Sequence, residues 1–323
     1  MKRVGLWSGV HRSIQAVFWT LLAALVAAPA QAAGQAAPGA DVDDAHVLVL
    51  GRISDDPRSD YDPLKALLDY VVPRMREVGI TEGRVLMARD ARQMASYLRR
   101  GRVDWVTEAA GTAVQLQQRA DARLLLLTER NGTSRYRTMF FVHRDSPIRN
   151  LSGLRGHTLA LQDPGSTSGY QVPMITLLDN GLVPGILAGP GDRPGADRVG
   201  YLFARSQLNV AVWVHKRMVD AGAISDLDWN DPARVPPAFK PSLRVVHQTD
   251  SYPGALELVG PGMRPEVEAR LRQVLLQAAE DPAAAQALEK FFDTSRFLPP
   301  DEDTRRSLAN LREGIARVNA EVE

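Results

Sequence analysis

Cysteine is absent from the 323-residue chain, and its absence excludes several kinds of chemistry. Disulfide bonds, thiolate metal sites and cysteine nucleophiles all require a thiol. A lipoprotein anchor is excluded for the same reason, because its lipid is attached to a cysteine at the cleavage site. The chain must therefore fold without covalent cross-links, and its length allows a hydrophobic core large enough to do so.

Aromatic residues are few, at 6%, and neither acidic nor basic residues form a long block. The lack of a charged block argues against a nucleic-acid-binding arm, so no nucleic-acid partner is expected. The contents of 45% apolar and 24% charged residues are those of a globular protein. After the first thirty residues no apolar run is long enough to span a membrane. The length is sufficient for two domains of ordinary size.

The N-terminal 32 residues have the pattern of a cleavable signal peptide. Three basic residues lie within the first twelve, the apolar run VFWTLLAALVAA follows, and Ala30-Gln31-Ala32 fits a small-x-small cleavage site. We predict cleavage after Ala32, a flexible leader over 33–45 and a periplasmic location. An uncleaved membrane anchor is the alternative. Removing three positive charges changes the formal net charge from +1 to −2, so any anion must be held by a local site.

The rest of the chain alternates short apolar runs with segments of helical apolar spacing. One group of strands and helices spans about 45–140, and a second spans about 146–248. This rhythm predicts an α/β fold with largely parallel sheets. The chain then returns for one strand at 254–260 and several helices. The Gly- and Pro-rich loop at 184–197 is predicted to be a surface excursion, and Pro73 is predicted to kink or divide the helix that contains it.

The stretch DPGSTSGY, residues 163–170, looks at first like the G-x-S-x-G elbow of a serine hydrolase. That elbow places its nucleophile midway between two glycines, but here the middle residue is Thr167, and Ser166 and Ser168 are out of register. A hydrolase also needs a histidine and an acid beside the serine. None of the six histidines lies in a recognisable motif, so a secreted serine hydrolase is a distant alternative.

The same stretch lies between a predicted strand and a predicted helix, which is a favourable place for an anion. The first turn of a helix has unpaired backbone N–H groups and the positive end of the helix dipole. Gly165 and Gly169 permit close backbone approach, and Ser166, Thr167 and Ser168 add hydroxyl donors. No lysine is present, so this is not a nucleotide-binding phosphate loop. An ordinary helix cap is the alternative, although a cap needs only one serine.

Five segments carry a resemblance to a known family, and D-P-x-S-T-S-G followed by V-P is the most specific of them. They are LGRISDDPRSDYDPLKALLDYV (50–71), GRVDWVTE (101–108), YRTMFFVHRDSPIRNLSGLRG (136–156), DPGSTSGYQVP (163–173) and VDAGAISDLDW (219–229). The chain resembles the periplasmic phosphate-, phosphite- and phosphonate-binding proteins of ABC importers. The resemblance implies a two-lobed type II periplasmic binding protein fold with a ligand cleft. Lobe 1 would comprise 46–140 and 252–323, and lobe 2 would comprise 141–251.

The resemblance also implies which residues face the ligand. Ser166, Thr167, Ser168 and Gly169 would hold the oxyanion group, and Tyr136 would line the cleft. The acidic residues by which the family recognises an amine do not align here. Aminoalkylphosphonate specificity is therefore not predicted.

Five further candidates lie in or near loops that are expected to face the cleft. They are Arg52, Tyr61, Glu108, Ser206 and Asp226. Arg52 could neutralise the oxyanion or pair with Asp55 or Asp56. The Glu108 carboxylate could accept a hydrogen bond from a P–OH group while repelling a fully ionised sulfate, or it could be a solvated acid. Asp226 has the same two interpretations.

The predicted function is capture of a small phosphorus oxyanion (phosphate, phosphite or phosphonate) by hinge closure, with delivery to a membrane permease and its ATPase. We expect no bond chemistry, no cofactor or metal, and a monomer. The chain segments that cross between the lobes are predicted near 139–145 and 245–256. A ligand-sensing subunit for a membrane histidine kinase is the main alternative, because it would need the same cleft.

Overall fold

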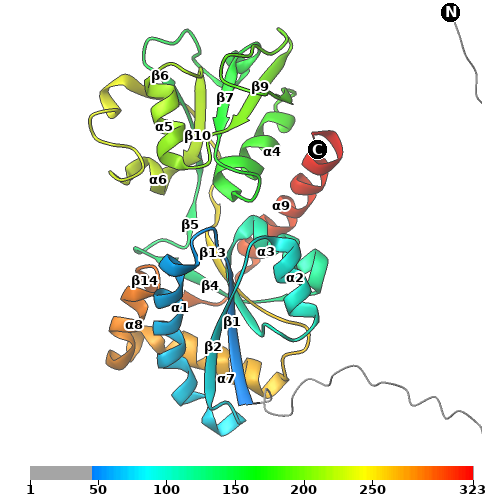
Figure 1. The fold of residues 1–323 in the computed structure, drawn as a ribbon, viewed down its shortest axis with the longest axis vertical. Coiled ribbons are helices and arrows are strands. Elements are labelled where there is room, and N and C mark those ends of the chain that lie inside the picture. Colours follow the sequence, from blue (N-terminus) through cyan, green and yellow to red (C-terminus); the bar gives the residue numbers. More distant parts are fainter. Residues whose placement is uncertain (1–45, 323) are drawn as a thin grey trace, which may run out of the picture. The chain divides into compact units, whose positions relative to one another are not determined.

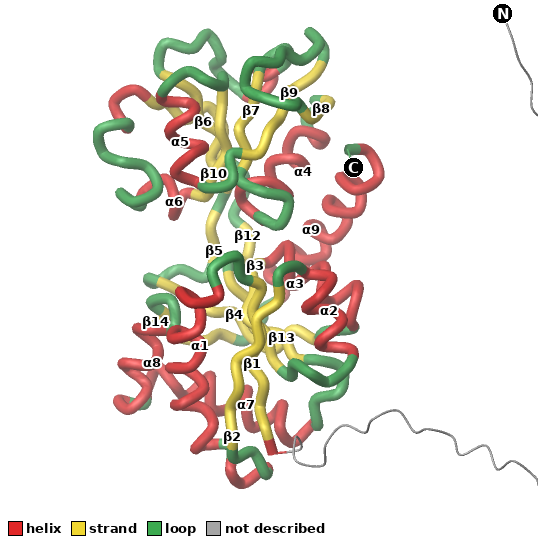
Figure 2. The backbone as a smooth tube through the Cα atoms, viewed as in Figure 1, coloured by secondary structure: helices red, strands yellow, loops and turns green. Residues whose placement is uncertain are grey.

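Residues 46–322 are described by the computed structural model, and the predicted signal peptide and leader lie outside them. Two α/β lobes, each built on a six-stranded sheet, make up this part of the chain (Figures 1 and 2). The predicted α/β class and its two-lobed architecture are confirmed. Within the described range, no helix combines the length and apolar character needed to cross a membrane.

Lobe 1 contains a mixed sheet with the strand order β14-β4-β13-β3-β1-β2. Its strands are β1 (Val47–Ile53), β2 (Glu82–Ala88), β3 (Trp105–Ala109), β4 (Arg123–Arg130), β13 (Ala255–Val259) and β14 (Thr294–Leu298). β1 is parallel to β2 and β3, whereas β13 runs antiparallel between β3 and β4. The carboxyl ends of the parallel strands lie at the same end of the sheet, so the loops that follow these strands lie close together.

Lobe 2 contains a second mixed sheet with the strand order β11-β6-β10-β7-β9-β8. Its strands are β6 (Thr138–His143), β7 (Thr158–Leu161), β8 (Val183–Ile186), β9 (Arg198–Phe203), β10 (Ala221–Ser225) and β11 (Leu243–Gln248). β7 is parallel to both β9 and β10. All four residues of β7 are buried, as expected for a parallel strand that is covered on both faces.

Helices cover both faces of each sheet. They are α1 (Pro57–Val71), α2 (Ala91–Arg99), α3 (Ala110–Ala120), α4 (Val172–Asp179), α5 (Gln207–His215), α6 (Asp226–Asn230), α7 (Pro265–Gln277), α8 (Ala285–Lys290) and α9 (Glu302–Glu321). In lobe 1, α1, α7 and α8 pack on one face, and α2, α3 and α9 pack on the other. α1 ends two residues before Pro73, which lies in a short 3-10 turn over Val72–Arg74, so of the two predicted effects the structure shows a division of the helix.

The chain passes between the lobes through a two-stranded ribbon. Its strands, β5 (Arg135–Tyr136) and β12 (Tyr252–Pro253), pair antiparallel. The second crossing, β12, lies within the predicted range 245–256. The first crossing, β5, comes before the predicted range 139–145, because β6 belongs wholly to the lobe 2 sheet. The ribbon is short, and this is the segment about which the lobes would have to rotate.

The C-terminal helix α9 contacts both lobes (Figure 1). Leu308 and Ile315 belong to a lobe 1 core, and Val318, one turn later, belongs to the lobe 2 core. Gly314 permits close approach to α4, because a Cβ atom there would lie 2.5 Å from Ile175. α9 is therefore a structural link between the lobes in addition to the ribbon.

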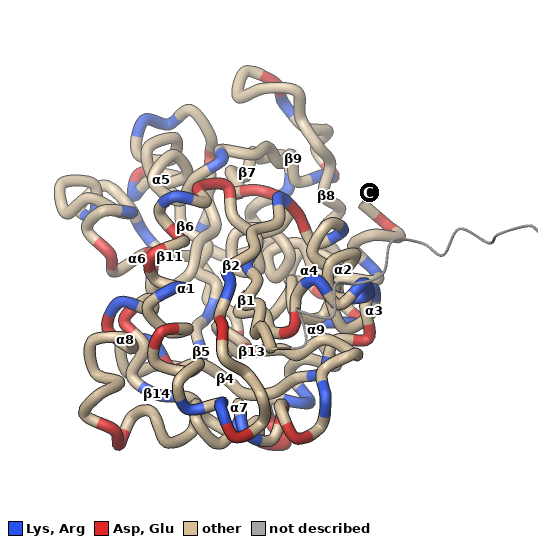
Figure 3. The backbone as a smooth tube through the Cα atoms, turned by 60° about the horizontal axis from the view of Figure 1, so that its bottom comes forward, with Lys and Arg blue, Asp and Glu red and all other residues tan. Residues whose placement is uncertain are grey.

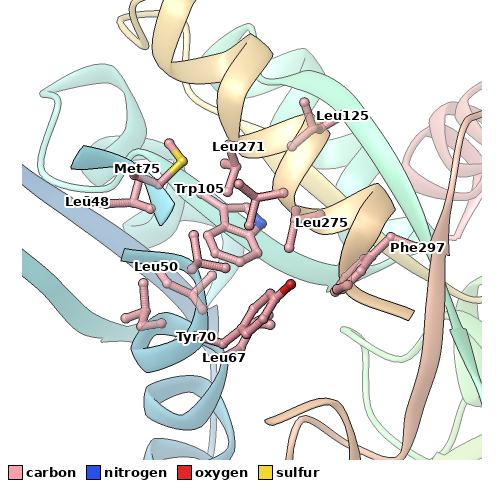
Figure 4. Close-up of a cluster of buried hydrophobic side chains, with 14 of the residues drawn as sticks. Leu48, Leu50, Leu67, Tyr70, Met75, Trp105, Leu125, Leu271, Leu275 and Phe297 are labelled. Carbon is pink, nitrogen blue, oxygen red and sulfur yellow. The ribbon is translucent and has the colours of Figure 1, made fainter. Parts of the chain in front are cut away.

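A buried carboxylate organises the centre of lobe 1. Trp105 lies among Leu50, Leu271 and other apolar side chains (Figure 4) and donates its Nε1–H to Glu257 Oε2 at 2.6 Å. The hydroxyls of Thr107 and Thr128 donate to Glu257 Oε1 at 2.8 and 2.6 Å. Burial raises the pKa of Glu257, while these hydrogen bonds oppose the shift. Three donors thus satisfy a carboxyl group that has no solvent contact.

Replacing Thr128 by valine should measure how much this network contributes to stability. Valine keeps the volume but removes one donor to Glu257, and we expect a loss of about 1–3 kcal/mol in the free energy of unfolding. Urea unfolding of Thr128→Val, compared with the exposed control Thr81→Val, measures it. A loss no larger than that of the control would show that the hydroxyl of Thr128 is dispensable.

Besides the ribbon strands β5 and β12, two strands at sheet edges were not predicted from the sequence. β8 lies at the start of the predicted loop 184–197 and contains Pro184, which is tolerated because β8 pairs only with β9 at the sheet edge. β14, with the sequence TSRFL, lies at the edge of the other sheet. Both strands are short and carry weak patterns, and tertiary pairing determines their conformation.

Candidate functional site

A cleft of about 880 Å³ lies between the lobes. Lobe 1 lines it with residues at the ends of β1 and β3 and in the turn after β2, and lobe 2 with residues that follow β7 and end β10. These are the carboxyl ends of parallel strands, where open α/β sheets bind their ligands. The topology therefore brings together segments that lie far apart in the sequence.

The DPGSTSGY stretch forms part of the lobe 2 wall. Residues Thr167–Gln171 form a π-helical turn that continues into α4, and Ser166 is its N-cap. Ser166 Oγ accepts from the Gly169 N–H at 3.0 Å and donates to Gln162 Oε1 at 2.9 Å. Ser166 is thus the helix cap considered as an alternative in the sequence. Capping does not use the hydroxyls of the next two residues, which also line the cleft.

Thr167 connects this turn to lobe 1. Gly111, the second residue of α3, donates its backbone N–H to Thr167 Oγ1 at 3.0 Å. The N-cap of α3 is Ala109, which offers no capping side chain. The Tyr136 hydroxyl also hydrogen-bonds to Thr167, and burial raises the pKa of Tyr136, so the phenol stays protonated. Two helix starts therefore meet at the cleft, and both dipoles favour an anion there.

Glu108 is a cleft residue whose carboxyl pKa lies near neutral pH. Its side chain is buried at the end of β3, and its Oε1 accepts from the Ile53 N–H at 2.6 Å. Burial raises the pKa of Glu108 to about 7, although the Arg52 guanidinium and the Ile53 amide oppose the shift. A carboxyl group poised in this way can accept a hydrogen bond when ionised and donate one when protonated.

Arg52 lies beside Glu108 and is held by two contacts. Its Nε pairs with Asp60 Oδ2 at 3.3 Å, not with the Asp55 or Asp56 carboxylates weighed in the sequence. Its guanidinium lies 4.4 Å from the ring centroid of Phe292, and the Arg130 guanidinium lies 4.8 Å from the same ring. One aromatic ring thus holds two cations near Glu108.

The structure brings six of the predicted ligand residues to the lining of one cleft. They are Arg52, Glu108, Tyr136, Ser166, Thr167 and Ser168. Gly169 is buried in the turn. Three others lie outside the lining: Tyr61 is 45% exposed on α1, Ser206 caps α5 through the Asn209 N–H, and Asp226 accepts from the Arg137 N–H at 3.1 Å.

Sequence reasoning missed several residues that line the cleft. Asp228 lies two residues after Asp226, accepts from the Ser225 hydroxyl at 2.6 Å and has its pKa raised by burial. The D-L-D spacing was visible, but only the structure shows which aspartate faces the cleft. Gln162 and Gln171 were also missed, because a glutamine near a turn carries no recognisable motif.

A basic rim, formed by Arg89, Arg92 and Arg119, borders the cleft on the lobe 1 side. Arg89 and Arg92 flank the start of α2, and Arg119 lies on α3. Elsewhere acidic and basic residues are interspersed along the backbone (Figure 3). Arg89 Nε pairs with Asp90 Oδ2 at 3.4 Å, and Asp55 and Asp163 also line the cleft, so acidic neighbours offset part of the charge of the rim.

Neither a metal centre nor a hydrolase triad is visible in the part of the chain that the structure covers. Residues 46–322 contain no group of three or more His, Cys, Asp or Glu side chains placed to hold a metal ion. No histidine of that range lines the cleft beside Ser166 or Ser168.

Two lobes with a cleft between them are the architecture of type II periplasmic binding proteins. Residues 55–304 match the family described as the phosphonate periplasmic substrate-binding protein of ABC transporters. Because this match covers most of the chain, the protein belongs to that family. The family consists of substrate-binding proteins that act in the periplasm with a transporter.

Solved structures of three proteins are similar to this chain. XAC2383 from Xanthomonas citri, described bound to chloride and to ATP, is 57% identical, with TM-scores of 0.83 and 0.82, over 86% of this chain and 100% of its own. PhnD1 from Prochlorococcus marinus, in complex with methylphosphonate, is 16% identical (TM-score 0.64) over 85% of this chain and 98% of its own. A phosphonate-transporter binding protein from Pseudomonas aeruginosa is 20% identical (TM-score 0.59) over 86% and 98%. The last two share the fold.

Proposed function

We propose that this protein captures a phosphorus oxyanion in the cleft and delivers it unchanged to an ABC permease and its ATPase. The observation that carries the proposal is the meeting of two helix starts, where Gly111 of lobe 1 contacts Thr167 of lobe 2. An anion bound there would accept hydrogen bonds from both lobes and would favour their closure. The protein itself breaks no bond.

Within the proposed site each residue has a distinct task. Thr167 and Ser168 donate hydroxyl hydrogens to the oxyanion, and Tyr136 supports Thr167. Arg52 offsets the ligand charge. Glu108 interacts with a P–OH group, which phosphate and phosphonate carry near neutral pH and sulfate does not.

A nucleotide is the second candidate ligand, and two observations favour it. The cleft of about 880 Å³ is far larger than one tetrahedral oxyanion, and the basic rim extends beyond the turn. The 57% identical relative from Xanthomonas citri is described as bound to ATP. In this version the terminal phosphate would take the oxyanion position, and the other phosphates would lie along the rim.

Variants of the basic rim distinguish between these two candidate ligands. We expect Arg92→Ala with Arg119→Ala to weaken ATP binding by about tenfold for each arginine, because each loses a charge-assisted phosphate contact. Methylphosphonate is too small to span the rim, so its affinity should change less than about threefold. The charge-matched control is Arg76→Ala with Arg100→Ala. Equal weakening of both ligands would contradict the assignment of the rim to a longer anion.

Calorimetric titration of the purified protein, unfolded and refolded to remove ligand, tests the proposed function. The panel comprises phosphate, phosphite, methylphosphonate, aminoethylphosphonate, ATP and sulfate. We expect micromolar or tighter binding of at least one phosphorus compound and none of sulfate. A correctly folded protein that binds no phosphorus compound would exclude the proposal.

The sensing alternative uses the same cleft and differs only in the membrane partner. A histidine kinase encoded next to this protein would favour it, whereas a permease and an ATPase would favour transport. Uptake of the bound phosphorus compound by cells with and without this protein distinguishes the two. Transport requires that uptake falls when the protein is removed.

A further inference from the structure

We infer that Gln171 is a ligand-contacting residue whose side-chain amide forms hydrogen bonds with the oxyanion, and this inference rests on the proposed function. Gln171 is the last residue of the π-helical turn and lines the cleft. Its residue surface is 3% exposed. The family motif recognised in the sequence is D-P-x-S-T-S-G followed by V-P at 172–173, and it specifies neither of the two residues in between, Tyr170 and Gln171.

The side-chain amide of Gln171 has no partner of its own. Neither Nε2 nor Oε1 forms a hydrogen bond with any residue in 46–322, although both atoms are buried. Leaving a buried donor or acceptor unpaired costs about 1–3 kcal/mol, so such a group is usually retained for a function. A glutamine that served only to fill space could be replaced by methionine without this penalty.

The amide is directed at the start of α3. A Cβ atom on Gly111 would lie 1.5 Å from Gln171 Oε1 and 2.9 Å from Thr167 Oγ1. The amide therefore occupies the space that any side chain at position 111 would need. Gly111 of lobe 1 thus lies against Thr167 and Gln171 of lobe 2. This is the start of α3, where the Gly111 N–H donates to Thr167 Oγ1.

The chemistry of an amide fits a phosphoryl or phosphonyl group. Nε2–H donates to an ionised oxygen and Oε1 accepts from a P–OH group, so both protonation states are recognised without a change of net charge. Thr167, Ser168 and Gln171 all belong to the π-helical turn, and the amide would donate from the part of that turn that lies beside Gly111 of α3. A carboxylate at this position would repel the same oxygen.

A series of substitutions separates ligand contact from packing. With methylphosphonate as the probe, and phosphate and ATP titrated in parallel, we expect Gln171→Met to weaken binding about tenfold. Gln171→Glu should weaken binding about a hundredfold at pH 8 and recover part of the loss at pH 5, as the new carboxylate is protonated. Gln117→Met, on the outer part of α3, is the control and should bind normally.

The outcomes distinguish this inference from the proposed function. If Gln171→Met folds with unchanged thermal stability and binds as tightly as the unmodified protein, Gln171 is not a ligand contact. Destabilisation with unchanged affinity would likewise overturn the inference and make the residue a packing element. If the unmodified protein binds none of the three probes, the proposed function and the inference fail together. Should Gln171→Glu not fold, the affinity and stability of Gln171→Met alone decide whether Gln171 is a ligand contact or a packing element.

Discussion

Replacing Thr167 and Ser168 together by alanine should reduce the affinity for the bound phosphorus compound by roughly 10²–10⁴-fold. Each hydroxyl is expected to donate one hydrogen bond to an ionised oxygen, and each such bond contributes about 1.5–3 kcal/mol. Both residues are almost completely buried in the cleft wall, so water cannot easily replace the lost donors. The effect should appear as faster dissociation in stopped-flow measurements and as a raised Kd in calorimetry.

The control for this double variant is a change that spares the proposed site. Ser152→Ala removes an exposed hydroxyl from the same lobe, where it donates only to Asn150. The affinity of Ser152→Ala for the phosphorus compound should equal that of the unmodified protein. Ser166→Ala should instead act through the helix cap and lower stability by about 1 kcal/mol. If the Thr167/Ser168 double variant binds normally, the turn does not hold the oxyanion.

The second large effect is expected at Glu108, and it depends on pH. Burial raises the pKa of this carboxyl group from 4.5 to about 7, so the folded protein favours the protonated form. The corresponding stabilisation is fully present below pH 4.5 and is lost as the pH rises through about 7. Glu108→Gln cannot ionise and should gain stability relative to the unmodified protein over this window, by about 3 kcal/mol at most.

Ligand affinity should follow the same titration. Above pH 7 Glu108 is ionised and repels an anionic ligand. The ligand then binds either with uptake of a proton by the complex or with a lower affinity because of the repulsion. We expect the affinity for methylphosphonate, relative to that of Glu108→Gln, to fall by up to tenfold per pH unit above 7. Comparison at each pH removes the titration of the ligand itself. Parallel pH profiles for the two proteins would show that Glu108 does not face the ligand.

The class of fold could be predicted because it depends on patterns that act over long segments. Alternating strands and helices indicated two α/β groups, and Pro73 correctly divided the first helix. The edge strands β8 and β14 could not be predicted in this way. Their residues have no strong strand pattern and adopt the strand conformation because a neighbour, β9 or β4, provides the hydrogen bonds.

The part of the candidate site that a continuous sequence motif marks could be predicted. The part that the fold assembles from distant residues could not. The S-T-S-G turn is one continuous string, so its position at a helix start could be inferred. The sequence did not separate Ser166, which caps the turn, from Thr167, which contacts lobe 1. That distinction depends on Gly111, which lies 56 residues from Thr167 in sequence.

Choices between neighbouring polar residues also required the structure. Asp226 and Asp228 are both acids that follow a buried strand, but the first accepts from the backbone of Arg137 and the second lines the cleft. Arg52 could have paired with several aspartates, and the geometry of α1 selects Asp60. In each case the orientation of one helical turn decides the contact, and a single sequence does not specify it.

A crystal structure of the protein with methylphosphonate, or with whichever compound of the panel binds most tightly, tests the central claim most directly. We predict that phosphorus-bound oxygens lie within hydrogen-bonding distance of Thr167 Oγ1 and the Ser168 hydroxyl, with the start of α3 closing over them from lobe 1. A ligand bound only at the basic rim, or outside the cleft, with the turn unoccupied, would contradict the account.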